Sequence, residues 1–586
     1  PIYGGFDVLK AYIEEGHARG MKVIAWVECF LGGPSVAERK PEWLVMSRQG
    51  EPYFTSGGVK YYFMNPALPE VRDFLSKLYK ELVKNYDIDG IQLDYIRYPE
   101  SGDYTNDFSY DPYTRQLFEN ISGMDPVELS PEDEGWQEWC DFRVYMISSF
   151  VYRIVSEIKS LKPNIFISAD VRPDYDDSIT DVFQDPKTWT SRDYINSLTP
   201  MSYYLFEEPV MEDVKNTWAF AQGHSQLDVG LSTLMNVDPK ILLRQIHAAR
   251  EASATGVGLF EFQSIFSKGY DEMLKAGAFS SQAQAAYEEE QAVKLILKEI
   301  QRKIDDLYVK YGGMDRELAQ RYKELIGKLK VDLNDIKKAE TLKGAIEEVL
   351  EVMDRDMSLN GEVAARIRTD LATATNIVDG YIARQRFMAN HEVKAFQVEL
   401  PLDELKEEKQ AAFTVRALFD DNSSAVMYLD SSQYSVKSSN PKTAELDGDI
   451  IKLAKSGRAV ITVEILDTFN FDRVKDVDRK LTFTVDPTSE NVVSSSALGR
   501  LKATEVADSQ VRLDWSGAVT DSNIVGYIVY RNGKKIARTL DSCFIDSDVE
   551  ADKVYFYKVR GFDISGKTIY KSNETTVRTK PAKKTD

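Results

Sequence analysis

The first 280 residues alternate between two patterns of apolar positions. In residues 6–19 the side chains of Phe6, Leu9 and Ile13 recur at helical spacing, and Gly20 ends the pattern. Short runs of β-branched and bulky residues follow such stretches. These runs predict six strands, at residues 22–28, 90–95, 165–171, 195–203, 227–233 and 256–262. Strands that alternate with helices predict a parallel sheet with right-handed crossovers, either doubly wound or closed into a barrel.

Polar residues at the carboxyl ends of these strands distinguish the two folds. They are Glu28, Asp94, Asp170, Tyr203 and Glu261. An eight-stranded barrel gathers its site at this edge, whereas a doubly wound nucleotide-binding fold has a glycine-rich first turn, which this sequence lacks. We therefore predict an α/β fold of the TIM-type (β/α)8 barrel class over residues 1–285. Because only six strands are visible, we expect the first two strands to be missing from the chain.

The pattern changes twice after the barrel. Residues 286–390 combine apolar and charged positions at helical spacing and predict a helical hairpin or bundle that serves as a spacer. Residues 391–487 and 490–580 alternate in the manner of strands and predict two β-sandwiches. In the second of these, Trp515 is expected to be a core residue.

Composition narrows the function classes. The 586 residues carry 73 basic and 94 acidic side chains, a net charge of −21, which disfavours nucleic acid and anionic membrane surfaces as partners. The sequence contains no run of about 18 apolar residues and therefore predicts no membrane-spanning helix. The three cysteines are too far apart for a metal motif, and the four histidines lack zinc spacing, so we expect no metal and no cofactor. The oligomeric state is not predicted.

Two strands end in an acidic residue that could carry chemistry. In residues 89–99, Gln92 and Asp94 share one face of an apolar strand, and burial of the Asp94 carboxylate is costly unless Arg97 pairs with it or a site uses it. The next strand ends in the same way at Asp170. Glycoside hydrolysis needs two such carboxyl groups, one ionised beside the reacting carbon and one protonated at the leaving oxygen. A plain Asp94–Arg97 ion pair is the structural alternative.

Several segments resemble the family 10 glycosyl-hydrolase-like proteins. They are residues 17–26, Tyr-Phe-Met-Asn-Pro at 62–66, residues 86–99 with the specific run Asp-Tyr-Ile-Arg-Tyr-Pro, and Thr-Pro-Met-Ser-Tyr at 199–203. Ser-Ala-Asp-Val at 168–171 also matches a neighbouring group of the same superfamily. The resemblance covers about residues 1–280 and implies (β/α)8 barrels of mostly secreted bacterial proteins, some of which cut peptide-free peptidoglycan glycan strands. It implies a secreted, periplasmic or cell-surface protein whose signal peptide is not in this chain.

The C-terminal sandwiches resemble two other families. Residues 438–463 look like part of a bacterial immunoglobulin-like domain of the second group. The strand runs at 511–515, 526–530 and 555–559 resemble a fibronectin type III domain. Neither resemblance by itself implies sugar binding.

Other residues near the strand ends are candidates for substrate binding. Trp26 could stack on a sugar or belong to the barrel core, and Glu28 is expected to hold hydroxyl groups. Asn65 is expected either to bond a sugar hydroxyl or to form an Asx turn before the next helix. Tyr203 is expected either to donate to a carboxylate or sugar or to be a buried phenol. Tyr95 and Arg97, within the family-specific run, complete the set of predicted substrate-binding residues.

The preferred prediction is a glycosidase that acts on a polysaccharide or oligosaccharide. Asp94, next to Arg97, should stay ionised as nucleophile or base, and Asp170 should be the proton donor at a short carboxyl separation of about 5 to 5.5 Å. Glu261 lies between aromatic residues that should raise its pKa, and it is the reserve for the second carboxyl group. The alternatives are a catalytically silent carbohydrate-binding barrel and a metal-dependent polysaccharide deacetylase. The sugar, the linkage and the choice between internal and terminal cleavage are not predicted.

Overall fold

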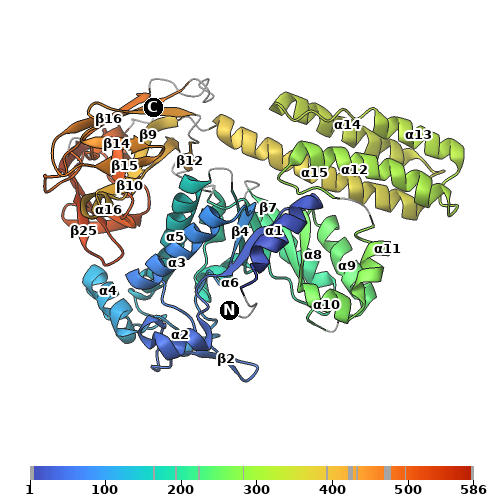
Figure 1. Cartoon of the computed structure of the whole chain (residues 1–586), viewed down its shortest axis with the longest axis horizontal. Helices are drawn as coiled ribbons and strands as arrows, with labels where there is room; N and C mark the ends of the chain where they lie inside the picture. Colours follow the sequence, from blue (N-terminus) through green and yellow to red (C-terminus); the bar gives the residue numbers. More distant parts are fainter. Residues whose placement is uncertain are drawn as a thin grey trace.

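The computed structural model (Figure 1) describes residues 5–582 with the exception of 163–164, 192–193, 222–224, 236, 281–282, 391–392, 420–425, 430–432, 467–476 and 495–496. The first part of the chain forms one six-stranded parallel sheet in the order β1-β4-β5-β6-β7-β8. Its strands are β1 Ile24–Glu28, β4 Gly90–Asp94, β5 Phe166–Val171, β6 Ser197–Pro200, β7 Gln226–Ser232 and β8 Gly256–Phe260. All six predicted strands are confirmed.

Helices alternate with these strands as the sequence predicts. They are α1 Val8–Ala18, α2 Gly33–Arg39, α3 Pro69–Asn85, α4 Pro112–Ser122, α5 Trp136–Leu161, α6 Tyr175–Thr180, α7 Pro186–Ser191, α8 Glu208–Ala221, α9 Pro239–Glu251, α10 Phe262–Ser267 and α11 Tyr270–Ala276. Local chemistry sets their starts: Asp111 accepts a hydrogen bond from the backbone N–H of Thr114, and Pro112 occupies the first turn of α4. A small antiparallel hairpin, β2 Phe54–Ser56 and β3 Val59–Tyr61, lies between α2 and α3.

The parallel sheet is curled. The ring of Trp26 on the edge strand β1 lies 6.1 Å from the ring of Phe260 on the other edge strand, β8, so the two edges approach each other across the inner face. The mixed α/β class and the curled parallel sheet agree with the barrel prediction. The six strands are two fewer than a closed (β/α)8 barrel needs, so closure stays a prediction.

A helical segment follows the sheet, as predicted. It consists of α12 Glu289–Lys303, the π-helical turn η4 Ile304–Val309, α13 Arg316–Gly327, α14 Ile336–Arg355 and the long α15 Gly361–Asn390. Apolar side chains at helical spacing, among them Val293, Ile300 and Leu371, pack into a core of their own. Figure 1 shows this bundle extending beyond α9, with α15 running along its whole length.

The last third of the chain is a set of antiparallel sheets. Its strands are β9 Val393–Leu400, β10 Gln410–Ala412, β11 Thr414–Phe419, β12 Val426–Tyr428, β13 Tyr434–Ser438, β14 Ala444–Asp447, β15 Ile450–Leu453, β16 Ala459–Ile465, β17 Lys480–Val485, β18 Lys502–Val506, β19 Val511–Asp514, β20 Val519–Asp521, β21 Gly526–Arg531, β22 Lys534–Thr539, β23 Cys543–Asp546, β24 Val554–Phe562, β25 Thr568–Lys571 and β26 Thr575–Arg578, with the short helix α16 Leu402–Glu407. Trp515 is buried against Tyr527, as predicted for a core residue.

The two predicted sandwiches share a sheet. Strand β20, from the region assigned to the second sandwich, pairs in parallel with β9 of the first, in the order β12-β11-β9-β20. The backbone N–H of Val398 also donates to the carbonyl of Ala518 at 2.9 Å. The predicted domain boundary at residues 487–490 therefore lies between two regions that share a sheet through the pairing of β20 with β9.

Helix α5 is the surface on which these sheets are docked. Its Tyr152 is hydrogen-bonded to Glu399 and Arg416 of the first sandwich, and these two residues form a buried ion pair at 2.5 Å. At the other end of α5, Glu138 pairs with Arg538 of the second sandwich at 3.1 Å. Figure 1 shows the antiparallel sheets of the last third of the chain lying next to α5 and α3. Among the described residues, no helix is long and apolar enough to cross a membrane.

Replacement of Gly526 by alanine should weaken this docking. A Cβ atom at Gly526 would lie 1.9 Å from the hydroxyl oxygen of Tyr145 on α5, so the ring or the strand must move. We expect a loss of about 1–3 kcal/mol of stability, typical of overpacking, and faster proteolysis between the sandwiches and α5. At Gly344 in α14, where a Cβ meets nothing within 4 Å, the same substitution should stabilise the helix by about 0.5–1 kcal/mol. Limited proteolysis with thermal unfolding measures both, and equal behaviour of the two variants would contradict the prediction.

Candidate active site

Three acidic residues form a row at the carboxyl end of the sheet. Glu28 of β1 is the register partner of Asp94 of β4. Leu93 is paired with Ala169 of β5, so the next positions along these two strands are Asp94 and Asp170. Neighbouring strands are about 4.8 Å apart, and side chains at matching positions point the same way. The predicted pair of carboxyl groups therefore comes from directly adjacent positions.

Asp94 is enclosed and hydrogen-bonded. It is 8% exposed, and its carboxylate accepts hydrogen bonds from the backbone N–H of Tyr95 at 2.6 Å and from the indole N–H of Trp26 at 3.1 Å. Burial raises its pKa, and the hydrogen bonds and the positive charge of Arg97 only partly offset this effect. We expected the positive charge of Arg97 to keep Asp94 ionised; this charge acts in the expected direction, but desolvation outweighs it and the pKa of Asp94 is raised.

Arg97 has other partners. Its guanidinium lies 3.5 Å from the carboxylate of Glu100 and 5.1 Å from the ring centre of Tyr95. The plain Asp94–Arg97 ion pair that we considered is not the contact this guanidinium makes. The Tyr95 ring in turn lies 5.8 Å from that of Phe63, so Arg97 and Tyr95 support the strand end from the side.

Asp170 holds a proton more strongly. It is 6% exposed and accepts a hydrogen bond from the side-chain amide of Gln92 at 2.6 Å. Burial, followed by the negative charge of Asp94, raises the pKa of Asp170 to about 8, and the indole N–H of Trp26 acts in the opposite direction. Trp26 thus favours the ionised form of both groups, through its hydrogen bond to Asp94 and through a smaller effect on Asp170. The raised pKa of Asp170 has the direction expected of a proton donor.

A buried glutamine joins the ends of the two acidic strands. The strand pairing between β4 and β5 extends to Leu93 and Ala169, just before the acidic residues. Beyond it, the fully buried Gln184 donates from its side-chain amide to the carbonyls of Asp170 at 3.0 Å and Ile96 at 3.4 Å. Its carbonyl accepts from the backbone N–H of Arg172 at 3.2 Å. Gln184 was not among the predicted site residues, since no local sequence pattern marks a loop residue that bonds to the ends of two strands.

Three aromatic side chains surround the carboxyl pair. Trp26 is 47% exposed, which does not fit its alternative role as barrel core. Phe260 lies between Trp26 and Tyr203, with ring centres 6.1 Å and 5.9 Å away and its plane tilted only 18° from that of Tyr203. The charges of Asp170 and Asp94, after burial, raise the pKa of Tyr203, so its hydroxyl lies near both carboxylates. Phe260 was not among our candidates, although it directly precedes one.

Glu28 forms the outer end of the acidic row. Partial burial and the charge of Asp94 raise its pKa, and its side chain is exposed to solvent. Such a carboxylate at the rim of the site is accessible to a ligand.

Two predicted site residues have structural roles instead. The carboxylate of Glu261 caps α10 by accepting from the backbone N–H groups of Gln263 and Ser264. The hydroxyl of Ser264, followed by these backbone groups, lowers the pKa of Glu261, whereas we expected aromatic neighbours to raise it. Asn65 is fully buried: its amide oxygen accepts from the backbone N–H of Ala67, and its nitrogen donates to Thr114, both at 2.9 Å. This is the Asx-turn alternative, and it leaves the amide of Asn65 without access to a ligand.

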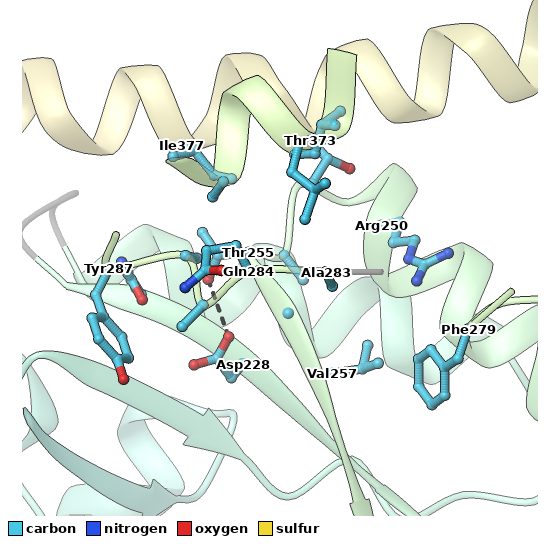
Figure 2. Close-up of a pocket in the computed structure, with 18 of the residues that line it drawn as sticks. Asp228, Arg250, Thr255, Val257, Phe279, Ala283, Gln284, Tyr287, Thr373 and Ile377 are labelled. Atoms are coloured by element: carbon cyan, nitrogen blue, oxygen red, sulfur yellow. Dashed lines mark hydrogen bonds between the residues drawn. The ribbon is translucent and has the colours of Figure 1, made fainter. Parts of the chain in front are cut away.

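The opposite end of the sheet contains a cavity of about 480 Å³ between the strands and the helical segment. Figure 2 shows Asp228 and Thr255 on the sheet side and Thr373 and Ile377 of α15 above them. The Asp228 carboxyl accepts from the hydroxyls of Ser197 at 2.8 Å and Thr255 at 3.4 Å, and burial raises its pKa. The amino ends of barrel strands serve stability rather than chemistry, so we assign these contacts to packing.

Among the described residues, no group of three or more His, Cys, Asp or Glu side chains has the arrangement of a metal site. His17 pairs with Asp89 at 2.8 Å and His247 with Glu251 at 3.1 Å. The other two histidines, His224 and His391, lie outside the described residues.

Replacement of Asp94 by asparagine should lower the pKa of Asp170. The substitution removes the negative charge that disfavours ionisation of Asp170, while burial keeps the pKa above its ordinary value. Titration of ¹³C-labelled aspartate by NMR, with the signal assigned through Asp170→Asn, should give a value near 8 in the parent and a value at least one unit lower in the variant. Asp87→Asn, at an exposed surface position, should change nothing. An unchanged Asp170 titration in Asp94→Asn would show that the two carboxyl groups do not interact.

Replacement of Gln184 by methionine should loosen the ends of β4 and β5. The side chain keeps its length, but the carbonyls of Asp170 and Ile96 and the N–H of Arg172 lose their buried partner, at a cost of about 1–3 kcal/mol. Hydrogen–deuterium exchange should detect this as faster exchange in both strand ends. Gln137→Met, which removes an exposed hydrogen bond to Asp141, is the control and should leave these amides unaffected. Equal exchange in the two variants would exclude a bridging role for Gln184.

Comparison with known proteins finds similarity to proteins named as glycosyl hydrolases or glycosyl hydrolase-like. Residues 3–222 match the family model "Glycosyl hydrolase-like 10". The chain is 27% identical over 175 residues to "Glycosyl hydrolase YngK" of Bacillus subtilis (strain 168), a match that covers 28% of this chain and 29% of that protein. It is 22% identical over 243 residues to "Glycosyl hydrolase DigH" of Escherichia coli (strain K12), covering 36% of this chain and 50% of that protein.

A solved structure also matches. It is the PgaB (BpsB) glycoside hydrolase domain from Bordetella bronchiseptica, with 15% identity, a TM-score of 0.38, and coverage of 46% of this chain and 79% of that chain. The chain thus spans half or less of the length of the two curated relatives named above. The family resemblance predicted from the motifs is confirmed for this part of the chain: residues 3–222, which hold Asp94 and Asp170, match the model of the glycosyl hydrolase-like 10 family.

Proposed function

We propose that this protein is a glycoside hydrolase that cleaves O-glycosidic bonds of a polysaccharide, with Asp170 as proton donor and Asp94 as its ionised partner. The observation that carries the proposal is the pair itself: two buried carboxyl groups lie at adjacent strand ends, Asp94 accepts a hydrogen bond from the indole N–H of Trp26, and burial beside Asp94 raises the pKa of Asp170 to about 8. An acid that is protonated at neutral pH beside a second carboxyl group is the requirement of glycoside hydrolysis.

The two carboxyl groups have distinct tasks in this mechanism. Asp170 transfers its proton to the glycosidic oxygen as the bond to the anomeric carbon breaks, and the Asp94 carboxylate attacks that carbon to form a glycosyl ester. Water then attacks the ester while Asp170 takes up the proton of the water, which restores both groups. A short carboxyl separation of about 5–5.5 Å and retention of configuration are part of this proposal, and the placement of Asp94 and Asp170 at directly adjacent positions of neighbouring strands supports it.

The proposed substrate is a bacterial or dietary glycan, and peptide-free peptidoglycan strands are one candidate. The support is the family of residues 3–222 and the relatives named as glycosyl hydrolases. We further propose that Trp26, Tyr203 and Phe260 form the surface on which a sugar ring rests next to the carboxyl pair, and that Glu28 bonds its hydroxyls. A location outside the cytoplasm, where such polymers occur, is part of the same proposal.

A carbohydrate-binding barrel without catalysis is the second candidate. The observation that favours it is the raised pKa of Asp94, since a carboxyl group that resists ionisation is a weak nucleophile. The two candidates differ in a measurable way, because binding alone requires no proton transfer.

Asp94→Asn and Asp170→Asn should each lower glycan cleavage by at least about 100-fold while glycan binding is retained. Release of reducing ends from peptide-free peptidoglycan, chitin-type and plant glycans measures cleavage, and retardation in glycan-containing gels measures binding. The parent rate should fall as the pH rises through about 8, because the donor must be protonated and loses its proton there. Asp87→Asn, at an exposed position, is the matched control. Unchanged cleavage in either variant would refute the pair, and binding by the parent without cleavage of any glycan would favour the silent barrel.

A further inference from the structure

Exposed aromatic side chains continue past the carboxyl pair on the β8 side. Directly after Phe260, α10 presents Phe262, 68% exposed, and Phe266, 54% exposed, with ring centres 4.9 Å apart. The helix is held in place by the cap from Glu261 and by Lys268, whose ammonium donates to the carbonyls of the loop after β7. Exposure of large aromatic rings to water is unfavourable. A pair of exposed rings on a helix that is fixed by these contacts therefore indicates a binding surface.

A second aromatic group lies on the β1 side. Tyr53 and Tyr62 directly precede and follow the hairpin of β2 and β3, with ring centres 6.1 Å apart, and the Lys60 ammonium on β3 lies 3.6 Å from the centre of the Tyr53 ring. Its base is tied to the segment just after β1, because the N–H of Gly32 donates to the carbonyl of Tyr62 at 2.8 Å. In Figure 1 the hairpin labelled β2 projects from the same lower side of the molecule on which α10 lies.

The carboxyl pair lies between these two groups in the sheet. In the order β1-β4-β5-β6-β7-β8, the hairpin follows the first strand, α10 follows the last, and Asp94 and Asp170 end the second and third. Trp26 and Phe260, whose rings approach to 6.1 Å, connect the two sides next to the pair. In the strand order the two aromatic surfaces therefore lie on either side of the carboxyl groups, and the approach of Trp26 to Phe260 brings the two sides together at the mouth of the site.

We infer that a glycan chain of several sugars lies across this end of the sheet, from the β2–β3 hairpin to α10, so that bonds inside the chain are cleaved. This inference rests on the proposed function and adds the mode of action. Sugar rings have apolar faces that pack on aromatic rings, and a chain that passes the carboxyl pair needs such contacts on both sides. An enzyme that releases terminal sugars needs them on one side only.

The test separates the two sides by substitution. Phe262→Ala/Phe266→Ala removes the α10 surface, and Tyr53→Ala removes the hairpin surface. Tyr311→Ala, at an exposed tyrosine of the helical segment, is the control. Each is made in an Asp170→Asn background so that the chain remains uncut, and retention is measured in gels that contain glycol chitin, peptide-free peptidoglycan strands or mixed-linkage β-glucan. Disaccharides of each glycan are the short-chain comparison, and thermal unfolding verifies the fold.

Both site variants should weaken retention by the glycan that the parent binds, each by roughly tenfold, with less than about a twofold effect on the disaccharide. The control should match the parent. In the catalytically intact protein, long fragments should appear before short ones. Loss of retention from one side only, or from neither, would overturn the inference, as would a parent that binds none of the three polymers. Two-sided retention without any cleavage would overturn the proposed hydrolysis and leave the chain-binding surface standing.

Discussion

Two carboxyl groups that are buried next to each other cannot both be ionised without a large electrostatic cost, and this constraint organises the site. The parallel register of β1, β4 and β5 makes it unavoidable, because it sets Glu28, Asp94 and Asp170 at matching positions. The structure meets the cost by leaving a proton on Asp170 and by directing the Trp26 N–H at the pair. A buried carboxyl group that keeps its proton in this way lowers stability and is at the same time what acid catalysis requires.

The rest of the fold stabilises this arrangement from the side away from the site. Gln184 joins the strand ends where the recorded ladder stops, and α5 leads into the strand that carries Asp170. The sandwiches pack on the outer face of α5 through the buried pair of Arg416 and Glu399. A buried ion pair contributes little net stability but penalises any other docking geometry, since separation leaves a charge without its partner. The carboxyl end of the sheet stays open to a polymer.

The features that could be predicted from the sequence are those that depend on local chemistry or on periodic spacing of apolar residues. The six strands were visible because each is an apolar run flanked by helical spacing, and Asp94 and Asp170 were visible because an acid ends such a run. The prediction for Glu261 was wrong because helix α10 begins directly after it. The Glu261 carboxylate is used to cap the backbone N–H groups of this helix. Gln184, Phe260 and the pairing of β20 with β9 depend on contacts between segments distant in sequence, which periodicity does not encode.

Trp26 connects substrate binding with the protonation state of the pair. Its ring is half exposed at the mouth of the site, while its N–H donates to Asp94 and acts on Asp170. In the proposed function, a sugar packed on this ring would displace water from both carboxyl groups, and lower hydration disfavours the second negative charge further. Asp170 would then hold its proton more firmly with a ligand bound than without one, and would release it as charge develops on the glycosidic oxygen. The aromatic surface and the acid pair therefore act as one unit, because the same indole serves both.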